Sequence, residues 1–152
     1  MVSVCLYFQV HQPYRIGKYS VFEIGNHTNY FDNTKNEAVM RKVATKCYLP
    51  ANNLLLSVLA KNPGFKASYS FTGVVLDQFQ EYVPEVIESF QELTDTGRVE
   101  ILDETYYHSL AFLYSPKEFR EQVSLHRKKV RELFGQTPKV FRNTELIYNN
   151  EL

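Results

Sequence analysis

A lone acid, Glu145, lies at the end of the β-branched and aromatic run 139–145. If this run is a strand, its side chains alternate between two faces, and Glu145 shares a face with Phe141 and Asn143. A carboxylate at a strand end is a typical way to present a catalytic acid. A solvated edge strand running into the turn at 148–150 would show the same pattern. The other strand ends must therefore decide between the two interpretations.

An imidazole ends the first apolar run in a similar way. Residues 2–10 carry strand-forming side chains on both faces, which is typical of a central parallel strand covered on either side. Pro13 cannot donate a backbone hydrogen bond, so the strand should stop near His11. We expect His11 to lie at the mouth of the sheet.

Further strands alternate with helices along the chain. Residues 65–72 alternate between apolar and small polar side chains, and residues 99–104 form a third short strand that groups Glu100, Leu102 and Glu104. Apolar spacing predicts a helix after a cap at Asn36, and further helices over 50–62, 74–82, 84–97 and 115–135. The last begins with a capping box, Ser115 and Glu118, and ends at Gly135.

Strands separated by helices predict an α/β fold with a parallel sheet. Ligands bind such sheets at the carboxyl ends of the strands. His11, Thr72, Glu104 and Glu145 would meet there, with Glu100 deeper in the sheet. The irregular, aromatic-rich segment 12–35 is long enough to be functional, and we interpret it as a ligand-covering loop.

Composition narrows the class of protein. A chain of 152 residues suits one domain, and its 17 basic and 17 acidic residues offer no basic excess for nucleic acid. Cys5 and Cys47 fit no zinc or CxxC spacing, which favours reduced thiols and a cytoplasmic setting. No run is long enough to cross a bilayer, and residues 2–10 make a poor signal peptide.

Three segments together resemble glycoside hydrolase family 57, the α-amylase and 4-α-glucanotransferase group. They are His11-Gln12-Pro13, the segment 97–102 and the segment 141–146, each at a predicted strand position. The stretch 104–108 is similar to the amylase-like branch of the family. Arg98 stands where the family more often has Gln.

The resemblance implies an incomplete seven-stranded (β/α) barrel, of which residues 1–152 would be the N-terminal portion with about four strands. It implies retaining chemistry on an α-glucan oligosaccharide or polysaccharide, without cofactor or metal. Glu145 would be the catalytic nucleophile, and His11, Glu100 and His108 would contact or support the substrate. A buried Glu100 would need a partner such as His11. The family's acid/base Asp belongs to a motif beyond position 152, so we expect little or no activity from this chain alone.

Two other classes of protein remain open. A metal-dependent polysaccharide deacetylase would need an Asp with two closely spaced histidines, and the four histidines form no H-x₃-H pair. A noncatalytic carbohydrate-binding or interaction module could derive from a degenerate barrel. The open sheet edge expected after a fourth strand would then favour self-association.

Overall fold

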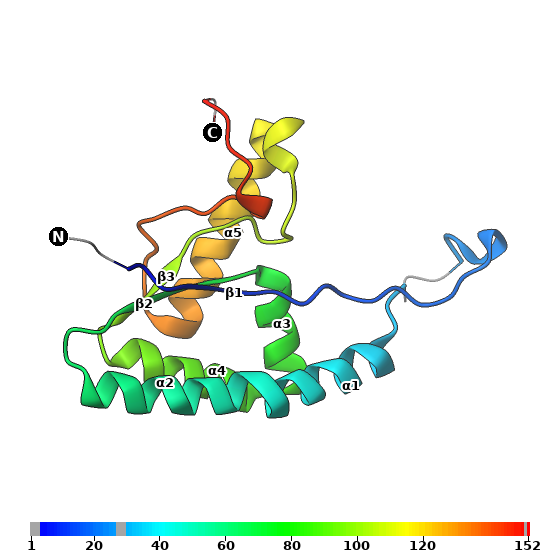
Figure 1. Cartoon of the computed structure of the whole chain (residues 1–152). Helices are drawn as coiled ribbons and strands as arrows, with labels where there is room; N and C mark the ends of the chain where they lie inside the picture. The colour runs from blue at the N-terminus through cyan, green and yellow to red at the C-terminus, as the bar shows by residue number, and fades with distance from the viewer. Residues whose placement is uncertain (1–3, 27–29, 151) are drawn as a thin grey trace.

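The sheet has three parallel strands in the order β1-β2-β3, namely Tyr7–Val10, Ala67–Phe71 and Val99–Leu102. The computed structural model describes residues 4–26, 30–150 and 152. In the register, Tyr7 pairs with Ser68, and Ser68 with Glu100. Figure 1 shows the strands running side by side above α1, α2 and α4. The predicted parallel α/β class is confirmed.

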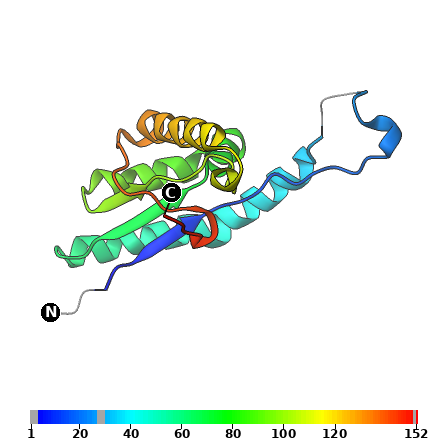
Figure 2. The ribbon, with the colours of Figure 1, turned by 90° about the horizontal axis from the view of Figure 1, so that it is seen from above.

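In the described residues, five α-helices lie on one side of this sheet. They are α1 Asn33–Val43, α2 Leu49–Lys61, α3 Gly73–Tyr82, α4 Pro84–Asp95 and α5 Pro116–Phe134. A π-helical segment, Ala44–Tyr48, joins α1 and α2 into the long helical rod of Figure 2. The cap predicted at Asn36 is wrong, because Asp32 accepts the hydrogen bond from the Lys35 amide at the start of α1.

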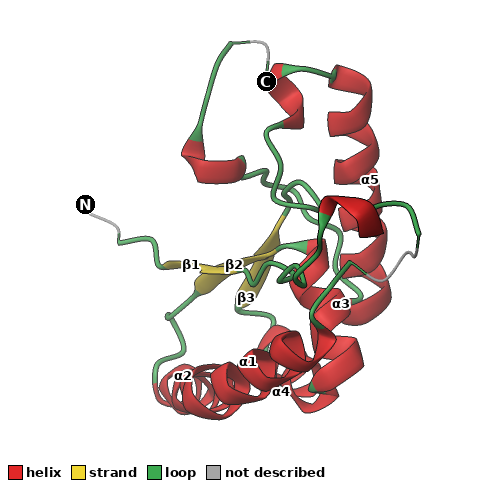
Figure 3. Ribbon diagram, turned by 90° about the vertical axis from the view of Figure 1, so that its right-hand side faces the viewer, coloured by secondary structure: helices red, strands yellow, loops and turns green. Residues whose placement is uncertain are grey.

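The core lies between the sheet and these helices. Phe71 packs edge-on to Phe90 of α4, with ring centroids 4.7 Å apart, and stacks on Phe134 of α5 at 5.5 Å. Every second strand residue points this way, as the buried Tyr69 and Ile101 show. In the described part of the chain the helices lie on one side of the sheet (Figure 3). The opposite face carries Tyr7 and Ser70, whose hydroxyls are 2.6 Å apart.

The predicted fourth strand, 139–145, is not a strand. It pairs with the end of β3 through one parallel bridge, between Asp103 and Phe141. The Gln136 side chain covers the next part of that edge, accepting from the Ile101 amide and donating to the Val99 carbonyl. The chain then turns into the 3₁₀ segment Thr144–Leu146, which breaks the expected alternation. The edge of β3 is therefore covered by the segment 136–142, and self-association through an open edge stays a prediction.

The long segment after β1 forms an arm rather than a cover. A bridge between Ile16 and Phe31, and a hydrogen bond from the Gly17 amide to the Tyr30 carbonyl, close its base. Figure 2 shows the described part of this arm extending away from the body of the molecule. The ligand-covering interpretation therefore does not hold for its outer part, although its base reaches the site described below.

His126 of α5 anchors the end of β3 from inside the core. Its ring nitrogens lie 2.9 Å from Asp103 Oδ1 and 2.7 Å from the Phe71 carbonyl, and Arg127 binds the other Asp103 oxygen. Both His126 and Asp103 are buried. This cluster fixes the backbone immediately before Glu104.

In the described residues, no helix is both long and apolar enough to cross a membrane.

Candidate active site

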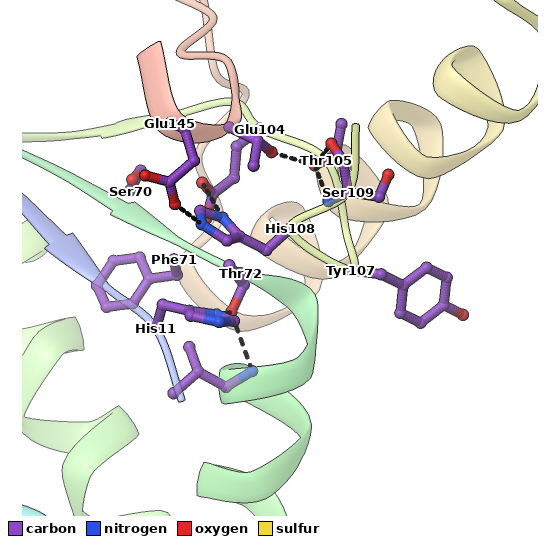
Figure 4. A network of polar contacts seen from close by, with 12 residues as sticks. His11, Ser70, Phe71, Thr72, Glu104, Thr105, Tyr107, His108, Ser109 and Glu145 are labelled. Carbon is purple, nitrogen blue, oxygen red and sulfur yellow. Dashed lines mark hydrogen bonds and ion pairs between the residues drawn. The ribbon is translucent and has the colours of Figure 1, made fainter. Parts of the chain in front are cut away.

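Polar side chains from all three strand ends meet at one edge of the sheet (Figure 4). His11 follows β1, Thr72 follows β2, and Glu104 lies just after β3. His11 Nδ1 is 2.9 Å from Thr72 Oγ1. Thr72 is the N-cap of α3, and the same oxygen accepts a hydrogen bond from the Val75 amide. The start of a helix thus fixes the orientation of the His11 ring.

His108 lies at the centre of this group. Its ring stacks on His11, with centroids 4.3 Å apart and planes 26° apart. On one side, its Nε2 is 3.2 Å from Glu145 Oε1. On the other side, its Nδ1 is 3.9 Å from Glu104 Oε2, which is an ion-pair distance but too long for a hydrogen bond. One imidazole therefore lies between two carboxylates.

His108 and Glu145, which are in contact through their side chains, both have left-handed backbones. His108 and Glu145 each have a φ of 54°, which costs a residue other than glycine about 1 kcal/mol or more. The two loops are joined by a buried contact of 3.0 Å between the Thr105 and Thr144 hydroxyls. Such strain persists only where the surroundings impose it, and it is common at functional sites.

Tyr106 attaches the loop that carries Glu104 and His108 to α3. Its hydroxyl donates to the Asp77 carboxylate, at 2.8 and 2.9 Å from the two oxygens, and Lys129 pairs with the same acid. Its ring lies directly over Gly73, where an added Cβ would be 2.3 Å from the ring atoms. Only glycine allows this close approach.

The two stacked histidines differ in charge. Burial, and after it the neighbouring His108, lower the pKa of His11 from 6.5 to about 4, against the opposing effect of Glu145. Glu104 and then Glu145 raise the pKa of His108, against the opposing effect of burial. At a pH near 6.5 we therefore expect a protonated His108 stacked on a neutral His11.

An aromatic hollow of about 400 Å³ opens beside the two histidines. We define it by its lining residues: His11, Pro13, Tyr14, Phe31, Val74, Asp77, Tyr107 and His108. The Tyr14 and Phe31 rings lie 4.9 Å apart, and Tyr107 is half exposed. Flat rings with a few polar groups suit a sugar ring, whose faces are apolar and whose edge carries hydroxyls.

Of the predicted site residues, the structure brings together His11, His108 and Glu145. Glu100 lies elsewhere: its side chain is exposed and lines a separate hollow with Lys66 and Arg98, near the start of β2 and β3. The expectation of a buried Glu100 bonded by His11 is wrong, because His11 bonds Thr72 instead. Its role in contacting substrate stays a prediction.

Sequence reasoning placed Glu104 at a strand end but gave it no role. The structure buries it completely beside His108, and the spacing of four residues between the two could have indicated their contact. No pattern in the sequence marks the contact of Tyr106 with Gly73, or the hydroxyl pair of Thr105 and Thr144. These depend on how separate loops meet.

A parallel sheet with helices on one side and a polar cluster at its strand ends is the arrangement found in part of a (β/α) barrel. The family model for glycosyl hydrolase family 57 matches residues 5–152, and the chain belongs to that family. The predicted resemblance is confirmed.

Two relatives of similar sequence are named as α-amylases. A protein of Methanocaldococcus jannaschii named "Putative alpha-amylase" is 45% identical over 151 residues, which is 95% of this chain and 31% of the relative. "Alpha-amylase 1" of Dictyoglomus thermophilum is 25% identical over 97 residues, covering 64% of this chain and 14% of the relative. The chain thus spans less than a third of each relative's length.

Solved structures share the fold. A 4-α-glucanotransferase from Thermococcus litoralis superposes with a TM-score of 0.70 at 19% identity, over 97% of this chain and 20% of that chain. The α-amylase AmyC from Thermotoga maritima gives 0.63 at 16% identity, over 97% and 36%. A family 4 carbohydrate esterase from Streptomyces lividans gives 0.52 at 16% identity, over 96% and 53%. At these identities the likeness concerns the fold alone.

Proposed function

We propose that this chain carries the nucleophile half of a retaining α-glucan-active glycosidase, with Glu145 as the nucleophile. One observation supports this most strongly. Glu145 is held in a left-handed turn at the carboxyl end of the sheet, with His108 Nε2 at 3.2 Å from one of its oxygens. Its side chain is otherwise 71% exposed and is therefore accessible to a ligand.

The geometry suits attack on an anomeric carbon. His108 binds Glu145 Oε1, and in the described residues Oε2 has no hydrogen bond, so Oε2 is free to form the bond to carbon. Attack breaks the glycosidic bond and gives a glycosyl ester of Glu145, which water or a sugar hydroxyl later cleaves. The sugar that reacts would lie over His11 and His108, with neighbouring units in the aromatic hollow.

A retaining reaction also needs a proton donor for the leaving oxygen. That donor is a carboxyl about 5–5.5 Å from the nucleophile. The family resemblance assigns it to an Asp in a later motif of the longer relatives. We therefore expect this chain to bind α-glucan but to turn it over slowly or not at all. Hydrolysis and 4-α-glucan transfer share this half of the chemistry.

Maltooligosaccharide binding and turnover test the proposal together. We would follow amide shifts of the 152-residue chain on addition of maltotetraose, and product release by chromatography, for the wild type, Glu145→Gln and Glu88→Gln. Glu88 is an exposed acid of α4 and serves as the control. The proposal predicts shifts around His11 and His108 in all three proteins.

The outcomes separate the remaining alternatives. Turnover by the wild type that disappears in Glu145→Gln would overturn the expected inactivity and support the nucleophile. Affinity that is unchanged in Glu145→Ala, with no covalent chemistry at Glu145, would favour a noncatalytic binding module. Absence of any binding would count against α-glucan as the ligand. For a deacetylase, bound stoichiometric zinc would be expected; among the described residues, no group of three or more His, Cys, Asp or Glu side chains could hold a metal ion.

A further inference from the structure

We propose that Glu104 is a positioning residue that acts through His108 to hold the Glu145 carboxylate ready for attack. This inference rests on the proposed role of Glu145. It assigns a function to an acid that the family resemblance leaves without one. The three side chains form a series in which the imidazole of His108 lies between the buried acid and the exposed one.

The first observation is the burial of Glu104. Its side chain is 0% exposed, and in the described residues neither carboxylate oxygen has a hydrogen-bond partner. A buried carboxylate without a partner is costly to maintain, so its position calls for a compensating charge. The ion pair recorded for it is with His108, at 3.9 Å.

The second observation is the way in which His108 faces the two acids. Its Nδ1 is buried and points toward Glu104 without a hydrogen bond, while its Nε2 contacts Glu145. A charged imidazole in this place faces each carboxylate with an N–H group and compensates the charge of both, since each of its nitrogens then carries a hydrogen. A neutral ring could donate to only one of them.

The backbone fixes both ends of the series. Asp103, next to Glu104, is bound by His126 and Arg127 and by the bridge to Phe141. The left-handed backbone of His108 turns its ring toward Glu145. A shift of the backbone at Glu104 would therefore disturb the contacts of Asp103.

Other charged and titratable groups face the series from each neighbouring element. His11, at the end of β1, stacks on His108, and burial keeps it neutral near pH 6.5. The Arg142 guanidinium lies 5.7 Å from the centre of the Tyr7 ring, and Tyr7 also feels the charge of Glu104. No ion pair joins Arg142 to Glu104 in the part of the chain that the structure describes. His108 is thus the cation that Glu104 controls.

A pH titration of labelled histidine rings by NMR tests this directly. In the wild type we expect His108 to titrate above 6.5, the ordinary value for the residue. In Glu104→Gln, which keeps the shape of the side chain, the His108 midpoint should fall, because the change removes the largest cause of the raised His108 pKa. In Glu145→Gln we expect a smaller fall, because Glu104 has the larger effect on His108.

Glu100→Gln is the matched control, since Glu100 is exposed on β3, the strand that precedes Glu104, and lines a different hollow. The buried His126 ring reports whether the fold is intact, because it contacts Asp103 and Phe71 rather than the series. An unchanged His108 midpoint in a folded Glu104→Gln variant would overturn the proposal. If that variant does not fold, a wild-type His108 midpoint below 6.5 would overturn it instead.

This readout needs neither glucan nor turnover. A failure here would leave Glu145 as the proposed nucleophile, supported by its own tests. A failure of glucan binding or labelling would in turn leave the series of Glu104, His108 and Glu145 as a measurable property of the fold.

Discussion

Replacement of Gly73 by alanine should destabilise the protein through one defined contact. Gly73 is the first residue of α3, and its φ is not in the left-handed region, so its backbone can accept alanine without strain. In a helix this change ordinarily stabilises by about 0.4–1 kcal/mol. Here the new Cβ would be 2.3 Å from two atoms of the Tyr106 ring and 2.4 Å from a third. The ring must therefore move, and the sign of the effect is reversed.

The size of the loss follows from what Tyr106 would give up. Overpacking of this kind costs about 1–3 kcal/mol. Displacement of the ring also weakens the hydrogen bonding of the Tyr106 hydroxyl to the Asp77 carboxylate. A hydrogen bond to a charged group contributes about 1.5–3 kcal/mol to stability when it is intact. After the helix gain is subtracted, we expect a net loss of about 2–3 kcal/mol in the free energy of unfolding.

Urea unfolding followed by circular dichroism measures this loss. Gly64→Ala is the matched control, because Gly64 is exposed and an added Cβ there meets nothing within 4 Å. In a Tyr106→Ala background, Gly73→Ala should cost less than about 0.5 kcal/mol, since the two changes then no longer conflict. A loss that persists undiminished in that background would refute the reasoning.

Three further predictions concern the elements that support the site. Asp103→Asn should lower the free energy of unfolding by about 3 kcal/mol, because it breaks a buried charge cluster, whereas Glu132→Gln in the exposed pair with Lys128 should change it little. Ser115→Ala should cost about 1 kcal/mol in the same assay, because it removes the N-cap of α5; a loss near zero would contradict this. The pKa of His11 is about 4 in the folded protein, below its ordinary value of 6.5. Between these two pH values the unfolded state binds a proton at His11 that the folded state does not bind, so the free energy of unfolding should decrease as the pH falls through that window. A His11→Gln variant with an unchanged pH dependence of unfolding would count against this.

The helices and the first three strands could be predicted because local patterns specify them. The N-cap at Ser115, the apolar spacing of α5 and the left-handed Gly135 all appear where the sequence indicates. The other half of the predicted capping box is not formed, because the Ser115 amide donates to the Ala111 carbonyl and the Glu118 carboxylate accepts from Gln122. Thr72 caps α3 directly after β2, and this places it at the strand end with His11. Predicted strand ends differ from the observed ones by up to two residues in β2 and β3, whereas β1 begins only at Tyr7 although the strand-forming run begins at Val2.

The last segment was predicted wrongly because its pattern does not specify its pairing. Residues 139–145 have strand-forming side chains. In the described residues, however, this segment makes only two backbone hydrogen bonds to β3 and its end, both to Asp103, and the Gln136 side chain bonds the β3 backbone at Val99 and Ile101. The turn at Glu145 follows from a left-handed backbone that no local signal marks. Glu100 was placed near the site by its alternation with Glu104 and by the family resemblance. Alternation gives the face of the sheet but not the position along it.

Labelling with 5-fluoro-α-glucosyl fluoride tests the central claim most directly. Fluoride leaves without a proton from the protein, so a nucleophile can react even where no acid assists it. We predict one fluoroglucosyl adduct per chain by mass spectrometry, located by peptide mapping at Glu145, blocked by excess maltose and absent from Glu145→Gln. Labelling of the wild type at any other residue, or equal labelling of Glu145→Gln, would contradict the assignment of Glu145 as the nucleophile.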